Sequence, residues 1–186
     1  MNVSSRPSAS SGLLPTEAIL KLLPAIFEGR PFCQPTRPPT RNSVSRVEKS
    51  LGVKLPNLLL EVARSHPSYG YWFNSIGNDY RGCNHILGVN ASFRERGVPN
   101  RYVVFAQGFD DECDAWDLGE PCSGGERPIV YFHFSDDNEL TDLTRRFDTF
   151  HEFMDALCRQ CAPLCPLNEL RRAALQLIHD ADNFRP

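Results

Sequence analysis

The centre of the chain holds three short segments in which apolar residues follow the spacing of β-strands. Residues 102–107 read Tyr-Val-Val-Phe-Ala-Gln, an almost continuous apolar run that is typical of a strand covered on both faces. After a turn at Gly108, residues 113–117 interleave apolar and acidic side chains, as in a strand with one face toward solvent. Residues 129–134 form a third apolar segment behind a loop broken by proline and glycine. The three segments predict an antiparallel meander.

Helical spacing of apolar residues precedes the meander. Residues 15–28 carry apolar side chains on one face of a short helix. Residues 42–52 predict a second helix, for which Ser43 or Ser45 can serve as the N-cap. Residues 56–66 predict a third helix, because a proline suits the first helical turn. The second and third helices together predict a helix hairpin.

The remaining segments complete the predicted fold. Residues 85–89 predict the start of a short strand, and residues 90–100 a charged connection into the meander. After the meander, Thr149 and Glu152 have the spacing of a capping box at the start of an amphipathic helix. Residues 168–184 predict a last helix. The whole pattern predicts an α+β fold, in which a central and mostly antiparallel sheet is flanked by the N-terminal helix hairpin and by C-terminal helices.

Length and composition favour one globular domain. The 186 residues are 41% hydrophobic and 23% charged, which is ordinary for a soluble protein. Residues 1–14 are polar and rich in serine, so we expect a disordered tail, followed by a single domain over residues 15–186 with a helical extension at 167–184. Seven cysteines without an export signal favour reduced thiols. We therefore expect a cytoplasmic protein.

Charge is distributed unevenly along the chain. The net charge is only −3, yet residues 110–142 contain a single basic residue, Arg127. Eleven acidic residues lie in the same window: Asp110, Asp111, Glu112, Asp114, Asp117, Glu120, Glu126, Asp136, Asp137, Glu139 and Asp142. Such a concentration predicts a strongly negative region on and around the strands. It disfavours binding to nucleic acid, whose phosphates it would repel.

The order of several short motifs resembles the SUKH superfamily, the domain of fungal cell-wall synthesis regulators and of many bacterial toxin-immunity proteins. The resemblance covers residues 15–161. The motifs are Leu51-Gly-Val-Lys-Leu-Pro56, Ile86-Leu-Gly-Val89, Tyr102-Val-Val-Phe-Ala106, Ala115-Trp-Asp-Leu118, Pro128-Ile-Val-Tyr131 and Phe147-Asp-Thr-Phe-His-Glu-Phe153. The resemblance implies a non-catalytic domain that needs no cofactor. It also implies a protein partner, which for bacterial members is typically a toxin such as a nuclease or a nucleic-acid deaminase.

We therefore interpret the chain as an immunity protein that neutralises a toxin through an acidic sheet face. Clustered carboxylates can mimic phosphates and form charge-assisted hydrogen bonds with the basic residues of a nuclease cleft. Nearby aromatic side chains would supply apolar anchors. The expected partner-binding residues are Tyr71, Trp72, Phe109, Asp110, Asp111, Glu112, Asp114, Trp116, Asp117, Asp136 and Asp137. The alternative function is a regulatory scaffold that binds other proteins without inhibiting a toxin.

The acidic residues and the cysteines also allow structural and catalytic interpretations. The acidic residues can be a solvated face with Trp116 in the core. The acidic cluster lacks the glycine and the closing glutamate of a calcium loop. The cysteines Cys158, Cys161 and Cys165 share a helix face, but no second ligand pair completes a zinc site. No motif of a thiol enzyme surrounds Cys83. We predict no catalytic residue, no metal site and no cofactor.

Overall fold

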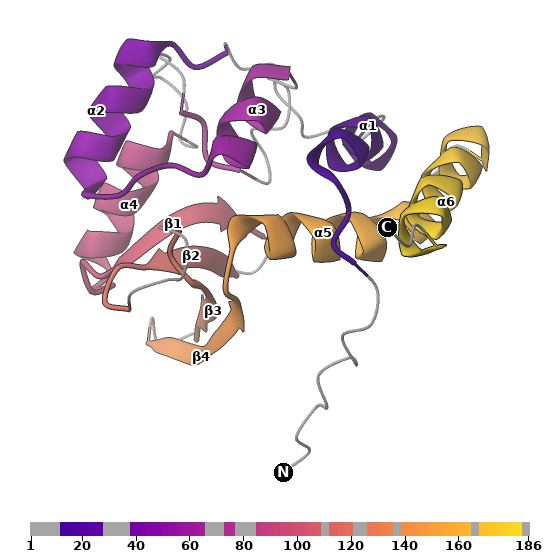
Figure 1. The fold of residues 1–186 in the computed structure, drawn as a ribbon. Coiled ribbons are helices and arrows are strands. Elements are labelled where there is room, and N and C mark those ends of the chain that lie inside the picture. Colours follow the sequence, from indigo (N-terminus) through magenta and orange to yellow (C-terminus); the bar gives the residue numbers. More distant parts are fainter. Residues whose placement is uncertain are drawn as a thin grey trace.

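The structure is a computed structural model with an α+β architecture, as the sequence predicted. It describes residues 12–27, 38–65, 73–76, 85–108, 112–120, 126–135, 139–164 and 168–183. Four strands form one sheet, and helices flank it (Figure 1). The elements are α1 (Thr16–Phe27), α2 (Arg41–Leu51), α3 (Asn57–Ser65), α4 (Ile86–Glu95), β1 (Tyr102–Gln107), β2 (Cys113–Asp117), β3 (Ile129–Phe134), β4 (Leu140–Phe147), α5 (Phe150–Cys161), the 3₁₀ helix η2 (Ala162–Leu164) and α6 (Asn168–Asn183).

The sheet is an antiparallel meander in the order β1-β2-β3-β4. The three predicted strands are all present. The sequence pattern did not predict β4, whose side chains are half-buried or exposed throughout. β4 lies at the edge of the sheet and buries few side chains, so its apolar and polar residues hardly alternate. This explains why the sequence pattern did not predict it.

Two hydrophobic clusters cover the two faces of the sheet. Helix α4 packs on one face, where Val89 and Phe93 belong to a hydrophobic cluster with apolar residues from all four strands. Helix α5 packs against the other face, and a larger cluster there joins Phe105 and Trp116 to apolar residues of α1, α2, α3 and α5. Figure 1 shows α5 leading away from the sheet toward α1 and α6. Because β1 lies between the two clusters, its first five residues are all buried, as its continuous apolar run predicted.

The outer edge of β1 is closed by side-chain and loop groups. The Asn90 side chain of α4 accepts a hydrogen bond from the Val104 N–H (2.9 Å) and donates one to the Val104 carbonyl (2.8 Å). The Asn74 N–H donates to the Phe105 carbonyl (2.8 Å). These bonds satisfy backbone groups that a further strand would otherwise pair with.

Two local predictions were wrong. Residues 85–89, predicted to begin a strand, instead begin α4, with His85 as the N-cap. The buried residues of this helix, Ile86, Val89 and Phe93, follow a helical spacing that a five-residue window cannot distinguish from a strand. The N-cap of α2 is Thr40, one helical turn before the predicted serines.

The N-terminal segment is fixed to α5 by a polar cluster. The Asp155 carboxylate accepts a hydrogen bond from the Leu14 N–H (2.9 Å), and Arg159 donates to the Gly12 carbonyl (3.2 Å). His151 bonds the Leu14 carbonyl through Nε2. Leu14 is fully buried in the core, beside these polar contacts. We call His151, Asp155 and Arg159 the α5 anchor.

Candidate protein-binding site

One face of the sheet is only partly covered by helices. Along β3, the side chains of Val130, Phe132 and Phe134 are buried under α4, whereas Tyr131 and His133 on the opposite face are only half-buried. Strand side chains alternate between the two faces, so this opposite face belongs to the α5 side of the sheet. We call its uncovered part, formed by Glu112, Asp114, Tyr131, His133 and Arg146, the open sheet face.

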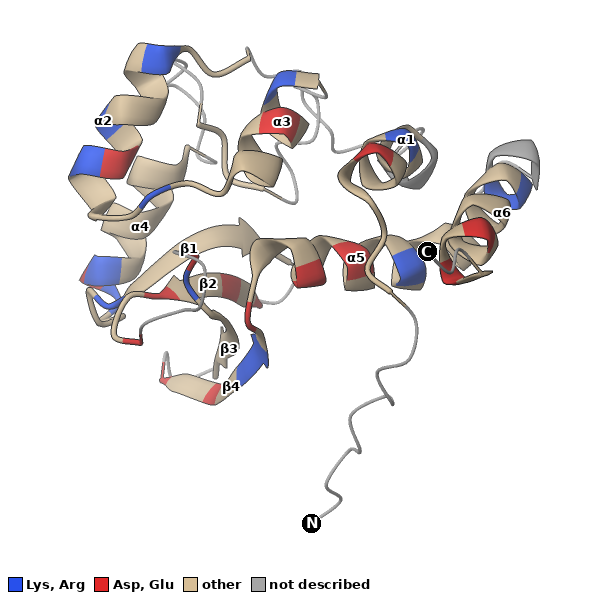
Figure 2. Cartoon of the chain, in the orientation of Figure 1, with Lys and Arg blue, Asp and Glu red and all other residues tan. Residues whose placement is uncertain are grey.

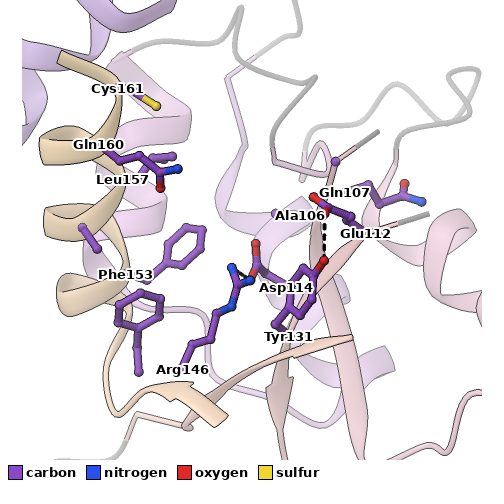
Figure 3. Close-up of a pocket in the computed structure, with 13 residues that line it drawn as sticks. Ala106, Gln107, Glu112, Asp114, Tyr131, Arg146, Phe153, Leu157, Gln160 and Cys161 are labelled. Carbon is purple, nitrogen blue, oxygen red and sulfur yellow. Dashed lines mark hydrogen bonds and ion pairs between the residues drawn. The ribbon is translucent and has the colours of Figure 1, made fainter. Parts of the chain in front are cut away.

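A pocket of about 220 Å³ lies where the open sheet face meets α5 (Figure 3). Its sheet side is built from Asp114 of β2, Tyr131 of β3 and Arg146 of β4, with Glu112 beside them. Its helix side is mostly apolar and consists of Phe153, Ala156, Leu157, Gln160 and Cys161. The pocket therefore combines charged groups on one side with an apolar wall on the other.

Asp114 is the most unusual group in the pocket. Its side chain is 21% exposed, and among the described residues its Oδ1 atom has no hydrogen-bond donor. The nearest cation is Arg146, whose Nη1 lies 3.9 Å from that atom, too far for a hydrogen bond. Burial raises the pKa of Asp114 to about 6, an effect that Arg146 opposes and Glu112 reinforces. This carboxyl group has lost water without gaining a full set of partners.

Tyr131 lies between the charged groups and fixes their positions. Its hydroxyl donates a hydrogen bond to Glu112 Oε1 (2.8 Å), and the Arg146 guanidinium lies 3.7 Å from the centre of its ring. Burial, together with the hydrogen bond and the charge of Glu112, raises the pKa of Tyr131 to about 12. The phenol thus stays protonated at neutral pH and acts as a hydrogen-bond donor and a flat cation-binding surface.

The predicted site residues have different locations. Glu112 and Asp114 line the pocket, so the structure brings these two together. Trp116 and Asp117 lie further along β2 and do not line it. Seven of the predicted residues lie outside the described residues: Tyr71, Trp72, Phe109, Asp110, Asp111, Asp136 and Asp137.

Trp116 belongs to the core and cannot anchor a partner in this conformation. It is 1% exposed, and its ring stacks on Phe105 with centroids 4.5 Å apart. Asp117 is equally unavailable, because it is 3% exposed and accepts hydrogen bonds from Arg101 and from the Gly119 N–H. Both residues stabilise the fold as described, and their assignment as partner-binding residues stays a prediction.

The described acidic residues do not form a uniformly negative surface. Arg101 pairs with Asp117, Arg145 with Glu120 (2.6 Å), and Arg146 lies near Asp114. Two further acids also have local partners: Glu126 accepts a hydrogen bond from the Phe150 N–H, and Asp142 contacts His133. Figure 2 shows acidic and basic residues interspersed over the strands and α5.

The charge count over residues 110–142 missed these arginines because Arg101, Arg145 and Arg146 lie just outside that window. In an antiparallel meander, residues that lie far apart in sequence face each other on neighbouring strands. Among the described residues the surface is therefore mixed in charge, and the expectation of a broad acidic face stays a prediction.

Sequence reasoning also missed Tyr131 and Arg146 as site residues. A signal for Tyr131 exists, because the alternation in residues 129–134 places it and His133 on one face and three strongly apolar residues on the other. No comparable signal marks Arg146, since β4 itself was not predicted. Phe153 and Leu157, both buried on the predicted amphipathic helix, also form part of the pocket wall.

Cys158 and Cys161 of α5 are buried thiols. Burial raises the pKa of Cys158 to about 12, so almost none of it is thiolate at neutral pH. No group of three or more His, Cys, Asp or Glu residues among those described is arranged to hold a metal ion, and Cys165 lies outside them.

We expect Cys158 to resist an aromatic disulfide reagent in the folded protein and to react rapidly once the protein is unfolded in urea. The thiolate is the reacting species. Burial keeps the thiol protonated and keeps the reagent away from the sulfur atom. Peptide mass spectrometry after a timed reaction would measure this. Equal modification rates with and without urea would show that this part of α5 opens readily.

Within the described segments, no helix is long and apolar enough to span a bilayer. The model of the SMI1/KNR4 family (SUKH-1) matches residues 38–156, from the segment before α2 into the middle of α5. No curated protein matches the chain. The family match contains the entire sheet and most of the pocket, and it leaves α1 and α6 outside.

Proposed function

The chain belongs to the SMI1/KNR4 family (SUKH-1), and we propose that it is a non-enzymatic immunity protein that binds and neutralises a toxin in the cytoplasm. Membership of this family is consistent with either an immunity or a regulatory role. The observation that carries the finer proposal is the open sheet face, where a pocket holds the Asp114 carboxylate, whose Oδ1 atom has no hydrogen-bond donor among the described residues.

Physical chemistry favours this surface as the docking site. A buried carboxylate without partners costs free energy in the isolated protein, and a partner that supplies donors would recover it. The apolar wall of α5 adds the desolvated centre that stable interfaces need. A toxin that cleaves or modifies nucleic acid carries lysine and arginine in its active site to hold phosphates. The pocket complements such a basic site, and occupying that site would block the toxin.

Reversing the charge of Glu112 should weaken this complex. Glu112 is exposed at the pocket, so Glu112→Lys should leave the fold intact and lower affinity by about tenfold or more through repulsion and the loss of one carboxylate. The matched control is Glu95→Lys. Glu95 is exposed at the end of α4, and this helix packs on the opposite face of the sheet. The partner to test is the proposed toxin, the protein encoded by the gene next to this one. Calorimetry would measure the affinity of the two proteins, and growth of cells that co-express them would measure protection.

Two outcomes would count against the proposal. If the neighbouring gene product neither binds the chain nor inhibits growth alone, the immunity role is wrong. If the two substitutions reduce affinity equally, the open sheet face is not the docking surface. A regulatory scaffold remains the second candidate, and binding to a partner whose activity is unchanged by the complex would favour it.

A further inference from the structure

The pocket beside Asp114 has the shape and chemistry to receive a single long side chain. At about 220 Å³ it is large enough for one extended lysine or arginine side chain and too small for a folded element. Figure 3 shows Phe153 and Leu157 projecting from α5 on one side of the space, with the carboxyl of Asp114 and the ring of Tyr131 on the other. An occupant must therefore be apolar along its length and polar at its tip.

The groups on the sheet side of the pocket favour a cationic tip. Two carboxylates, Asp114 and Glu112, lie there against one described cation, Arg146. Arg146 does not satisfy Asp114, because their nearest atoms are 3.9 Å apart and Oδ1 has no described donor. Arg146 is 43% exposed on the edge strand β4, so it can move outward when a second cation enters. A positively charged donor would complete the carboxylate's hydrogen bonds in a site of low dielectric.

We infer that this pocket binds one basic side chain, lysine or arginine, of the partner protein, with its methylene groups against Phe153 and Leu157 and its cation at Asp114 and Glu112. The inference rests on the proposed function, because it specifies what a partner inserts into the open sheet face. Long basic side chains bury their apolar stems and keep a polar environment for the charge, which matches the two sides of this pocket. Such an anchor in a partly desolvated pocket is the usual form of an interface hot spot.

Small probes test the inference without the partner. The full chain would be titrated with n-butylammonium and n-butylguanidinium, with butyramide as a neutral probe and butyrate as an anionic one, while backbone and side-chain NMR shifts are followed. We expect the two cations to shift resonances of Tyr131, Phe153 and Leu157, and to bind about tenfold or more tightly than butyramide. The relative affinity of the two cations distinguishes a lysine from an arginine anchor.

Two substitutions tie the binding to the carboxylates. Glu112→Gln, at an exposed position, and the isosteric Asp114→Asn should each weaken n-butylammonium binding by about tenfold, whereas Glu95→Gln on α4 should leave it unchanged. The NMR spectra of the variants also report whether each remains folded. If Asp114→Asn does not fold, the Glu112→Gln result alone decides whether the carboxylates bind the cation.

Binding should also weaken as the pH falls from about 7 to about 5, because Asp114, with its raised pKa, becomes protonated in that range. The other charged or titratable groups that face Asp114 or line the pocket are Glu112, Tyr131 of β3, Arg146 of β4 and Cys161 of α5. Repeating the titration with Asp114→Asn isolates the contribution of Asp114, since the variant should lose most of the pH dependence.

Butyramide binding as tightly as n-butylammonium would overturn the inference, as would unchanged cation binding in Glu112→Gln or the absence of shifts at the pocket residues with any probe. These results differ from a failure of the proposed function. A partner that still binds and is still inhibited, while the probes do not bind, would show that docking uses the open sheet face without a cationic anchor.

Discussion

Replacing Asp155 with alanine should lower the free energy of unfolding by about 3–4 kcal/mol. The Asp155 carboxylate is mostly buried and accepts hydrogen bonds from Arg159 Nε and from the Leu14 N–H. Its loss leaves the Nε of the partly buried Arg159 guanidinium and the buried Leu14 N–H without their acceptor. Removing one member of a buried ion pair costs more than the pair itself contributes, because the other member stays desolvated.

The effect should extend to both ends of the domain. Arg159 also donates to Asp182 of α6 and to the Gly12 carbonyl, so the α5 anchor connects the N-terminal segment, α5 and α6. Urea denaturation would measure the stability, and hydrogen exchange of Leu14 would show whether the segment detaches. Asp180→Ala is the matched control, since Asp180 lies exposed on α6 and bonds only Gln176 among the described residues. A loss below about 1 kcal/mol for Asp155→Ala would show that the anchor contributes little.

Two aspartates of β2 should respond to substitution by asparagine in opposite directions at neutral pH. Burial raises the pKa of Asp114 to about 6, above its value in the unfolded chain. The folded protein therefore binds a proton more tightly than the unfolded one, and this contribution to stability is present below about pH 4 and lost as the pH rises through about 6. Asp114→Asn should remove the cost of the ionised group and raise the free energy of unfolding by about 1–2 kcal/mol at neutral pH.

Asp117→Asn should instead destabilise the protein at neutral pH. Burial favours the neutral form of Asp117, but the hydrogen bonds from Arg101 and from the Gly119 N–H outweigh burial and lower the pKa of this carboxyl. A lowered pKa gives stability that is present above the unfolded-state pKa and is lost as the pH falls through the folded-state pKa. We expect a loss of about 1–3 kcal/mol, the usual effect of weakening a charged hydrogen-bond acceptor that is buried.

Urea denaturation of the two variants at about pH 4 and about pH 7 measures both effects. The stabilisation by Asp114→Asn should disappear at the lower pH, where the native carboxyl is already protonated. An equal loss of stability in both variants at neutral pH would mean that Arg146 satisfies Asp114 in solution as fully as Arg101 satisfies Asp117. A stabilised Asp114→Asn variant that has also lost its partner would show that this carboxylate is kept for binding at the expense of stability.

Local sequence signals predicted most of the fold correctly. The capping box at Thr149 and Glu152 marked the start of α5, and the glycine at position 52 ends α2 in a left-handed conformation. These features depend on residues that are close in sequence, where spacing and chemistry determine the structure. The β4 strand was missed for the opposite reason, because its existence depends on pairing with β3 and hardly on its own composition.

The site was harder to predict than the fold, since it depends on which residues face one another. Glu112 and Asp114 were identified from their charge, but their environment is set by Tyr131 and Arg146 on two other strands. Trp116 illustrates the same difficulty, because an aromatic residue beside acidic ones suits an interface and a core equally well in sequence. Strand register pairs Trp116 with Val103 and Ile129 beneath the helices. Trp116 is therefore a core residue and not part of an exposed interface.

The amide of Asn90 has a consequence for how molecules of this protein could associate. Because that side chain occupies both hydrogen-bonding groups of Val104, a neighbouring chain cannot extend the sheet beyond β1. Among the described strands, β4 then has the only free edge along which backbone pairing between copies can occur. If two copies pair through their β4 edges, each copy uses its free edge strand. The assembly then stops at a dimer and cannot extend into a fibril.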